Sequence, residues 1–183
     1  MAREPNILTL DGQRVDCLSS AGHPQVKTPN MDRLAREGMR FAQATTVSPI
    51  CMPARLSLIN GLYPHNYGIW ANYGELPATD ETFFQILQRA GYATAHVGKS
   101  HYYPHSERWF TAPHMKTREE YMHARGLEHV YETVDLSNFE RLGSFVRDRW
   151  EKLGLWETFK QDNRERSEIG GAMADHFMVR PSP

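Results

Sequence analysis

Short apolar runs alternate with helical segments along this 183-residue chain. Ile7 to Leu10, Met39 to Thr45 and Tyr92 to Val97 have the residue pattern of short strands. Helices are predicted over Pro29 to Glu37 and over Asp80 to Ala90, each followed by a glycine. Strands that alternate with helices are typical of an α/β fold. The sequence therefore predicts a mixed, mainly parallel sheet flanked by helices.

A cysteine opens the helical segment that carries the most chemical information. Cys51-Met52-Pro53-Ala54-Arg55 has the pattern C-x-P-x-R, and the helical run after it closes on Gly61. Pro53 suits the first turn of a helix, so Cys51 is predicted at or just before a helix N-terminus, where anions are favoured. Arg55 follows one turn later and can direct its guanidinium group at the same anionic centre. Taken alone, the pattern also fits a buried structural cysteine beside a proline.

Three further segments carry ordered patterns. Lys27 to Phe41 reads K-T-P-N-M-D-R-L-A-R-E-G-M-R-F, Gly61 to Ile69 reads G-L-Y-P-H-N-Y-G-I, and Ala90 to His101 reads A-G-Y-A-T-A-H-V-G-K-S-H. Together with C-x-P-x-R, and in this order, these segments resemble the type I sulfatases of the alkaline phosphatase superfamily. The resemblance covers the N-terminal portion of that family's catalytic domain.

The resemblance implies a covalent modification and a set of catalytic residues. In type I sulfatases a formylglycine-generating enzyme oxidises the motif cysteine, here Cys51, to formylglycine, whose hydrated aldehyde attacks a sulfate ester. Arg55 and Lys99 would stabilise the negative charge of the sulfate, and His101 would hold or deprotonate the hydrate. The implied function is a sulfuric ester hydrolase that acts on a small-molecule sulfate ester.

The first strand of the family delivers two adjacent metal ligands, and this chain matches one of them. Asp11 fits the first ligand, whereas Gly12 stands at the second position and has no side-chain oxygen. A hard cation prefers oxygen ligands, which favours calcium, with magnesium and manganese as alternatives. The formylglycine hydrate at Cys51 would be a further ligand. Gln13 or Asp16 could compensate by a register shift, and Asp11 could also be an ordinary surface carboxylate.

The chain is shorter than a complete sulfatase and has no match to the family's downstream metal ligands. We therefore expect the N-terminal portion of a catalytic domain, with core strands and the formylglycine helix in residues 1–112 and a helical insertion and tail in residues 113–183. A catalytically incompetent sulfatase-like fragment is the alternative. Half of a parallel sheet leaves an edge and a face uncovered, so self-association is expected.

Two capping boxes are predicted in the second part of the chain. Thr117 with Glu120 and Ser137 with Glu140 have the required spacing. After Ser137, apolar residues continue at helical spacing: Phe139, Leu142, Val146, Trp150 and Leu153. We expect the aromatic residues among them to form core and not a substrate site.

Asn72 is a second candidate for substrate binding, beside Lys99. It lies where the phosphonate monoester hydrolases of the superfamily carry an asparagine that contacts the substrate. A turn residue in Asn-x-Gly explains it equally well. Lys99 and His101 favour the sulfatase branch, and hydrolysis of phosphonate or phosphate monoesters is the alternative.

The other cysteine of the chain, Cys17, allows an alternative to formylglycine at residue 51. A disulfide between Cys17 and Cys51 would remove the proposed nucleophile, so the two interpretations exclude each other. Among the nine histidines, His105 and the four that follow it match no structural zinc pattern. We assign those five no role.

Charge and hydropathy argue against two classes of partner. The net charge is −1, and no basic cluster would track phosphates, so no nucleic-acid partner is expected. No apolar run approaches the about 20 residues of a transmembrane helix, so no membrane partner is expected. The N-terminus lacks the apolar stretch of a secretory signal, which predicts a cytoplasmic protein unless an export signal lies outside this sequence.

Overall fold

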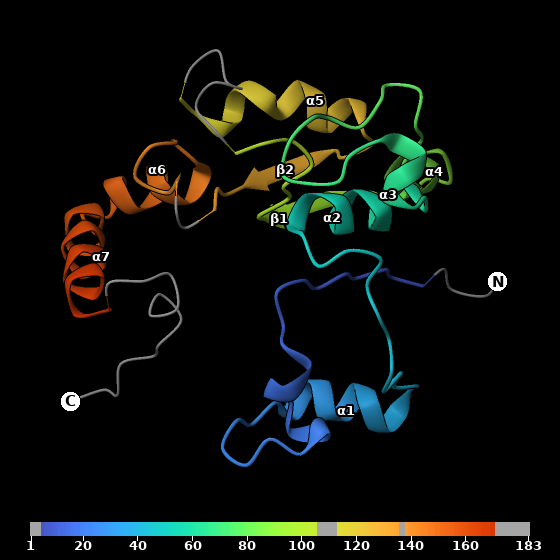
Figure 1. Cartoon of the computed structure of the whole chain (residues 1–183), viewed down its shortest axis with the longest axis horizontal. Helices are drawn as coiled ribbons and strands as arrows, with labels where there is room; N and C mark the ends of the chain where they lie inside the picture. The colour runs from blue at the N-terminus through green and yellow to red at the C-terminus, as the bar shows by residue number, and fades with distance from the viewer. Residues whose placement is uncertain (1–4, 106–112, 136–137, 171–183) are drawn as a thin grey trace. The chain divides into compact units, whose positions relative to one another are not determined.

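The computed structural model describes residues 5–105, 113–135 and 138–170. The chain forms two compact units, Met1–Thr45 and Thr46–Pro183 (Figure 1). The predicted boundary at residue 112 falls outside the described residues and stays a prediction. Within the described part of the chain, none of the helices combines the length and apolar character needed to cross a bilayer.

The first unit is built around helix α1, Pro29–Glu37, which begins and ends as predicted. Two short 3-10 turns, η1 (Val15–Cys17) and η2 (Ser19–Ala21), precede it. Asp32 accepts hydrogen bonds from the Ser19 hydroxyl at 2.6 Å and from the Ser20 backbone N–H at 2.9 Å. These bonds tie η2 to α1, and the bond from Ser19 is the main reason that the pKa of Asp32 lies below its usual value.

Both strands predicted in the first unit are wrong. Ile7 to Leu10 and Met39 to Thr45 are irregular in the structure. A strand needs a neighbour to accept its backbone hydrogen bonds, and no described residue of this unit forms one. Apolar side chains of both segments are therefore exposed, with Leu8 80%, Met39 79% and Phe41 74% accessible.

We predict that this apolar surface makes the chain self-associate, because no described residue of the first unit is buried. Light scattering behind a size-exclusion column should show an average mass that rises with protein concentration. The double variant Leu8→Ser, Phe41→Ser should lower that mass. Leu58→Ser, which changes an exposed leucine of the second unit, should not. A monomeric mass at every concentration would refute this prediction.

The second unit contains a parallel pair of strands, β1 (Ala95–Gly98) and β2 (His129–Glu132), shown together in Figure 1. Ala95 lies opposite His129, and Gly98 opposite Glu132. Between them in the sequence come η4 (Met115–Arg118) and α5 (Glu119–Ala124), and α5 packs on β2. The expected helices with a parallel sheet are thus confirmed. Because the strands are parallel, the residues that follow each of them emerge at the same end of the sheet.

Helix α2, Cys51–Asn60, begins at the motif cysteine and is closed by Gly61, as predicted. Gly61 adopts the left-handed conformation with φ of 71°, which glycine tolerates without a steric penalty. Met52, Leu56 and Ile59 repeat at helical spacing and are fully buried in the core. The face that carries these three residues therefore fixes α2 in the protein.

The short helix α3, Pro64–Tyr67, packs against α2 and is hydrogen-bonded to it through a buried hydroxyl. The Tyr67 hydroxyl donates to the Pro53 carbonyl at 2.6 Å and lies 2.7 Å from the Ser57 hydroxyl. Burial is the main reason that the pKa of Tyr67 lies above its usual value. The phenol therefore stays protonated and able to donate.

Helix α4, Phe83–Arg89, starts three residues later than the predicted Asp80. A capping box determines this start, because the Thr82 hydroxyl accepts from the Gln85 N–H and the Gln85 side chain accepts from the Thr82 N–H. The box predicted at Thr117 is wrong. Thr117 lies inside η4, and its hydroxyl donates to the His114 carbonyl at 2.8 Å.

The single helix predicted after Ser137 is also wrong, and Ser137 itself lies outside the described residues. Helix α6, Phe145–Lys152, begins only after Ser144, whose hydroxyl accepts from the Arg147 N–H at 3.3 Å. Helix α7, Trp156–Gly170, follows it. The aromatic residues of this region pack on one another as core, as expected: Phe139, Trp150, Trp156 and Phe159.

Candidate active site

The sulfur of Cys51 is exposed at the first residue of α2. Cys17 and Cys51 are free thiols in the structure and belong to separate units, so the choice between a nucleophile and a disulfide at residue 51 stays a prediction. The helix N-terminus presents backbone N–H groups that favour an anion, as the sequence indicated. Exposure at this end of α2 leaves residue 51 accessible to solvent.

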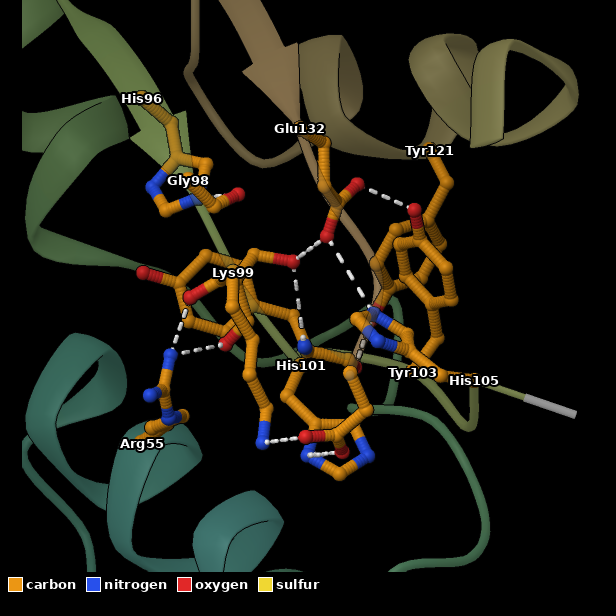
Figure 2. A network of polar contacts seen from close by, with 12 residues as sticks. Arg55, His96, Gly98, Lys99, His101, Tyr103, His105, Tyr121 and Glu132 are labelled. Atoms are coloured by element: carbon orange, nitrogen blue, oxygen red, sulfur yellow. Dashed lines mark hydrogen bonds and ion pairs between the residues drawn. The ribbon is translucent and has the colours of Figure 1, made fainter. Parts of the chain in front are cut away.

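A loop that follows β1 is hydrogen-bonded to α2. Arg55 donates from Nη1 to the backbone carbonyl of Lys99 and, at 3.2 Å, to that of Ser100 (Figure 2). The sequence predicted that Arg55 would face the anionic centre and did not predict these contacts. A guanidinium group presents several donors in a fixed plane, so one face of Arg55 can hold this loop against the helix.

Lys99 brings a positive charge to the exposed cysteine. Its Nζ lies 3.8 Å from Cys51 Sγ and 2.6 Å from Asp135 Oδ1. Asp135 comes shortly after β2, as Lys99 comes directly after β1, so the parallel strands explain why the two meet. The structure thus joins the predicted C-x-P-x-R helix and the predicted K-x-H segment at one place.

His101 is buried beside this ion pair, with Nδ1 3.8 Å from Asp135 Oδ2. Burial, followed by the nearby charges of His105 and Lys99, lowers the pKa of His101 to about 3. The imidazole is therefore neutral at neutral pH. Burial by itself would raise the pKa of Asp135, but the hydrogen bond and charge of Lys99 outweigh it, so that pKa lies below its usual value.

The backbone at His101 is strained. Its φ of 53° is left-handed, and no other non-glycine residue of the described chain has a positive φ. Such a conformation costs about 1–2 kcal/mol and persists where surrounding contacts impose it. Contacts of this kind hold the chain on both sides of His101. The buried carboxylate of Glu132 accepts hydrogen bonds from the hydroxyls of Ser100 and Tyr103 (Figure 2).

Sequence reasoning missed Asp135, Glu132 and His105 as members of this cluster. A usable signal existed for Asp135, because the run from His129 alternates in the manner of a strand and an acidic residue stands just past its end. His105 was assigned no role, yet its ring centroid lies 4.6 Å from that of His101. No local pattern marks Glu132, since its partners come from a separate part of the chain.

Asn72 lies at the N-terminus of α2. Its side-chain oxygen accepts from the Met52 N–H at 3.1 Å, which satisfies one of the unpaired donors of the helix. The sequence analysis predicted either a turn residue or a substrate contact for Asn72, and it did not predict this helix cap. Capping interactions of this kind contribute about 0.5–2 kcal/mol. The substrate contact stays a prediction.

Asp11 lies in the first unit, where its Oδ1 accepts from the Gly12 N–H at 2.6 Å. The two residues proposed as compensation are engaged elsewhere: the Gln13 side chain donates to the carbonyls of Arg14 and Cys17, and Asp16 pairs with Arg14. Calcium takes about six to eight oxygen ligands. Among the described residues, Asp11 belongs to no group of three metal-ligating side chains. These residues do not by themselves fit a calcium site.

Comparison with known proteins gives consistent matches. A family model described as Sulfatase matches residues 7–161. The chain is 36% identical over 130 residues to an ulvan-active sulfatase of Formosa agariphila, covering 70% of this chain and 25% of that protein. It is 36% identical over 101 residues to an N-acetylglucosamine-6-O-sulfatase of Bacteroides thetaiotaomicron, covering 54% and 18%. The solved structure of yidJ from Bacteroides fragilis, proposed to be a sulfatase, matches with a TM-score of 0.52 and 25% identity, covering 66% and 29%. The chain spans about a quarter or less of the length of the two named curated sulfatases.

Proposed function

Because this chain belongs to the sulfatase family, we propose that it carries the nucleophile and part of the anion-binding site of a sulfuric ester hydrolase. The observation that carries the proposal is the approach of Lys99 Nζ to within 3.8 Å of Cys51 Sγ, at a helix N-terminus. A cation and a set of backbone N–H groups beside one reactive side chain suit an anionic ester.

The nucleophile in this proposal is formylglycine at residue 51. A formylglycine-generating enzyme, with dioxygen as the oxidant, oxidises the Cys51 side chain at Cβ; the Cβ–S bond breaks, the sulfur leaves as hydrogen sulfide, and an aldehyde remains. Water then adds to the aldehyde to give a gem-diol. One hydroxyl oxygen attacks the sulfur of the ester, an O–S bond forms, and the bond from sulfur to the alcohol oxygen breaks as the alcohol leaves with a proton. The second hydroxyl then loses its proton, the carbonyl forms again, and inorganic sulfate is expelled.

The neighbouring side chains have separate roles in this reaction. Lys99 stabilises the charge on the sulfate oxygens, and Asp135 holds its ammonium group at 2.6 Å. Arg55 fixes the carbonyls of Lys99 and Ser100, which keeps the lysine next to α2, and contributes positive charge at the same end. His101 is neutral, so a ring nitrogen can accept a hydrogen bond from the hydrate and orient it.

Sulfatases are generally metal-dependent, and we assign Asp11 to a divalent ion, with calcium favoured over magnesium and manganese. When bound, such an ion would supply charge stabilisation for the sulfate and would lower the pKa of the hydrate. One carboxylate does not complete its coordination, so no step above depends on it. The substrate class is a small-molecule sulfate ester, which the sulfatase names of the relatives support.

We predict that Lys99→Met lowers kcat/KM for sulfate release by about 100- to 1,000-fold, the usual loss when one charge-stabilising donor is removed. The measurement is inorganic sulfate released from 4-nitrophenyl sulfate by formylglycine-containing protein. Lys116→Met is the matched control, because Lys116 also pairs with an aspartate, Asp148, at 2.7 Å but away from residue 51. Equal losses in both variants would contradict the assigned role of Lys99.

The same assay separates the proposal from its alternatives. A protein that contains formylglycine but releases no sulfate would support the catalytically incompetent alternative. Faster cleavage of a phenyl phosphonate ester than of the sulfate ester would support the phosphonate alternative.

A further inference from the structure

Two neighbouring histidines are buried without hydrogen-bond partners. The side chains of His101 and His105 are 4% and 1% exposed. Nδ1 of His101 and both ring nitrogens of His105 make no hydrogen bond among the described residues. Burying an unpaired polar nitrogen costs about 1–3 kcal/mol. Since His105 Nε2 faces Glu132 Oε1 at 3.5 Å, the Nδ1 atoms of the two rings are the ones that indicate a missing partner.

The two rings share a carboxylate neighbour. One ligating atom each from His101, His105 and Asp135 lies within 4.8 Å of the others, and Asp135 Oδ2 is 3.8 Å from His101 Nδ1. Three protein ligands that leave a fourth position open form a common type of zinc site. Bonds of about 2.0–2.2 Å require these atoms to close further. Asp135 can supply much of that movement, since it is only half-buried.

The groups around the cluster are those that orient metal ligands. Glu132 Oε1 lies 3.5 Å from His105 Nε2, so a proton on Nε2 would face the carboxylate and leave Nδ1 for an ion. Asp135 turns Oδ1 to Lys99 at 2.6 Å and keeps Oδ2 on the side of His101. The charges of Lys99 and Arg55 oppose a cation, and the carboxylates of Asp135 and Glu132 balance them.

The chemistry of the donors selects the ion. Imidazole nitrogen is a ligand for zinc, copper, nickel or iron, whereas calcium and magnesium prefer oxygen alone. We propose that His101, His105 and Asp135 form a binding site for a divalent transition metal ion of the zinc type, separate from the hard cation assigned to Asp11. Since His101 also belongs to the proposed catalytic residues, zinc would occupy it and inhibit sulfate release; this consequence alone rests on the proposed function.

Metal titration of the tag-free chain, freed of metal by a chelator, tests the site directly. Calorimetry should show one equivalent of Zn²⁺ bound, and Co²⁺ should give the intense visible absorption of a tetrahedral complex. His105→Phe should weaken Zn²⁺ binding by at least ~100-fold, because loss of a ligand exceeds the loss from a supporting residue. Asp135→Asn is a second variant, on a partly exposed position, should His105→Phe fail to fold.

Two controls make the result decisive. His65→Phe removes an exposed histidine outside the cluster and should leave Zn²⁺ affinity unchanged. Cys51→Ala should also bind Zn²⁺ normally, which separates this site from the proposed nucleophile. The proposal is overturned if the folded wild-type chain binds no zinc, if His105→Phe or Asp135→Asn binds it with full affinity, or if Cys51→Ala abolishes binding.

Discussion

Replacing Cys51 with alanine will abolish sulfate release, with a rate lower by about 10,000-fold or more. Loss of a covalent nucleophile typically costs that much, because the charge-stabilising groups alone give little turnover. The measurement is the initial rate with 4-nitrophenyl sulfate. Cys17→Ala, which removes the other free thiol, should retain the wild-type rate.

Cys51→Ser tests the need for two hydroxyls at residue 51. A serine hydroxyl can attack the ester once, but it has no second hydroxyl to expel the sulfate. We therefore expect slow formation of a stable sulfated serine, detectable by mass spectrometry of the peptide, with no turnover. Steady hydrolysis by either the alanine or the serine variant would show that residue 51 is not the nucleophile.

Leu56→Ala will reduce the free energy of unfolding by about 2–5 kcal/mol, the largest stability effect that we predict. Leu56 is 0% exposed in the core face of α2, and the cavity left by a shorter side chain cannot be filled without moving the helix. Urea denaturation followed by circular dichroism measures the change. Since α2 carries residue 51, the same variant should also reduce sulfate release.

Leu58→Ala is the matched control, on the same helix and with the same chemical change. Leu58 is 60% exposed, so its replacement should alter the free energy of unfolding by no more than about 0.5 kcal/mol. Similar losses for both variants would mean that the two faces of α2 are not buried as described.

Local signals were sufficient to predict α1 and α2. Each has a proline in its first turn and a glycine just past its end, and those residues act within a few positions of themselves. A strand was also predicted over Tyr92 to Val97, because apolar residues before Gly98 alternate. The observed strand β1, Ala95–Gly98, is shorter than predicted. Ile7 to Leu10 and Met39 to Thr45 have the composition of strands, but composition cannot provide the neighbouring strand that a ladder requires.

In the candidate site, too, residues in short motifs could be predicted, whereas residues brought in by distant contacts could not. Cys51, Lys99 and His101 were identified from short motifs, whereas Asp135 and Glu132 reach them only through the parallel register of β1 and β2. Register depends on contacts far apart in sequence, so the alternation from His129 can mark Asp135 as the end of a strand but cannot pair it with Lys99. The buried position of His105 depends on the same contacts.

The chemical state of residue 51 is the most direct test of the whole account. The chain should be expressed with and without a formylglycine-generating enzyme, digested, and the peptide that contains residue 51 analysed by mass spectrometry. We predict that coexpression replaces the thiol with an aldehyde, which an aldehyde-specific hydrazide will label, while the peptide with Cys17 keeps its thiol. An unmodified thiol at residue 51 in both preparations would contradict the proposed nucleophile.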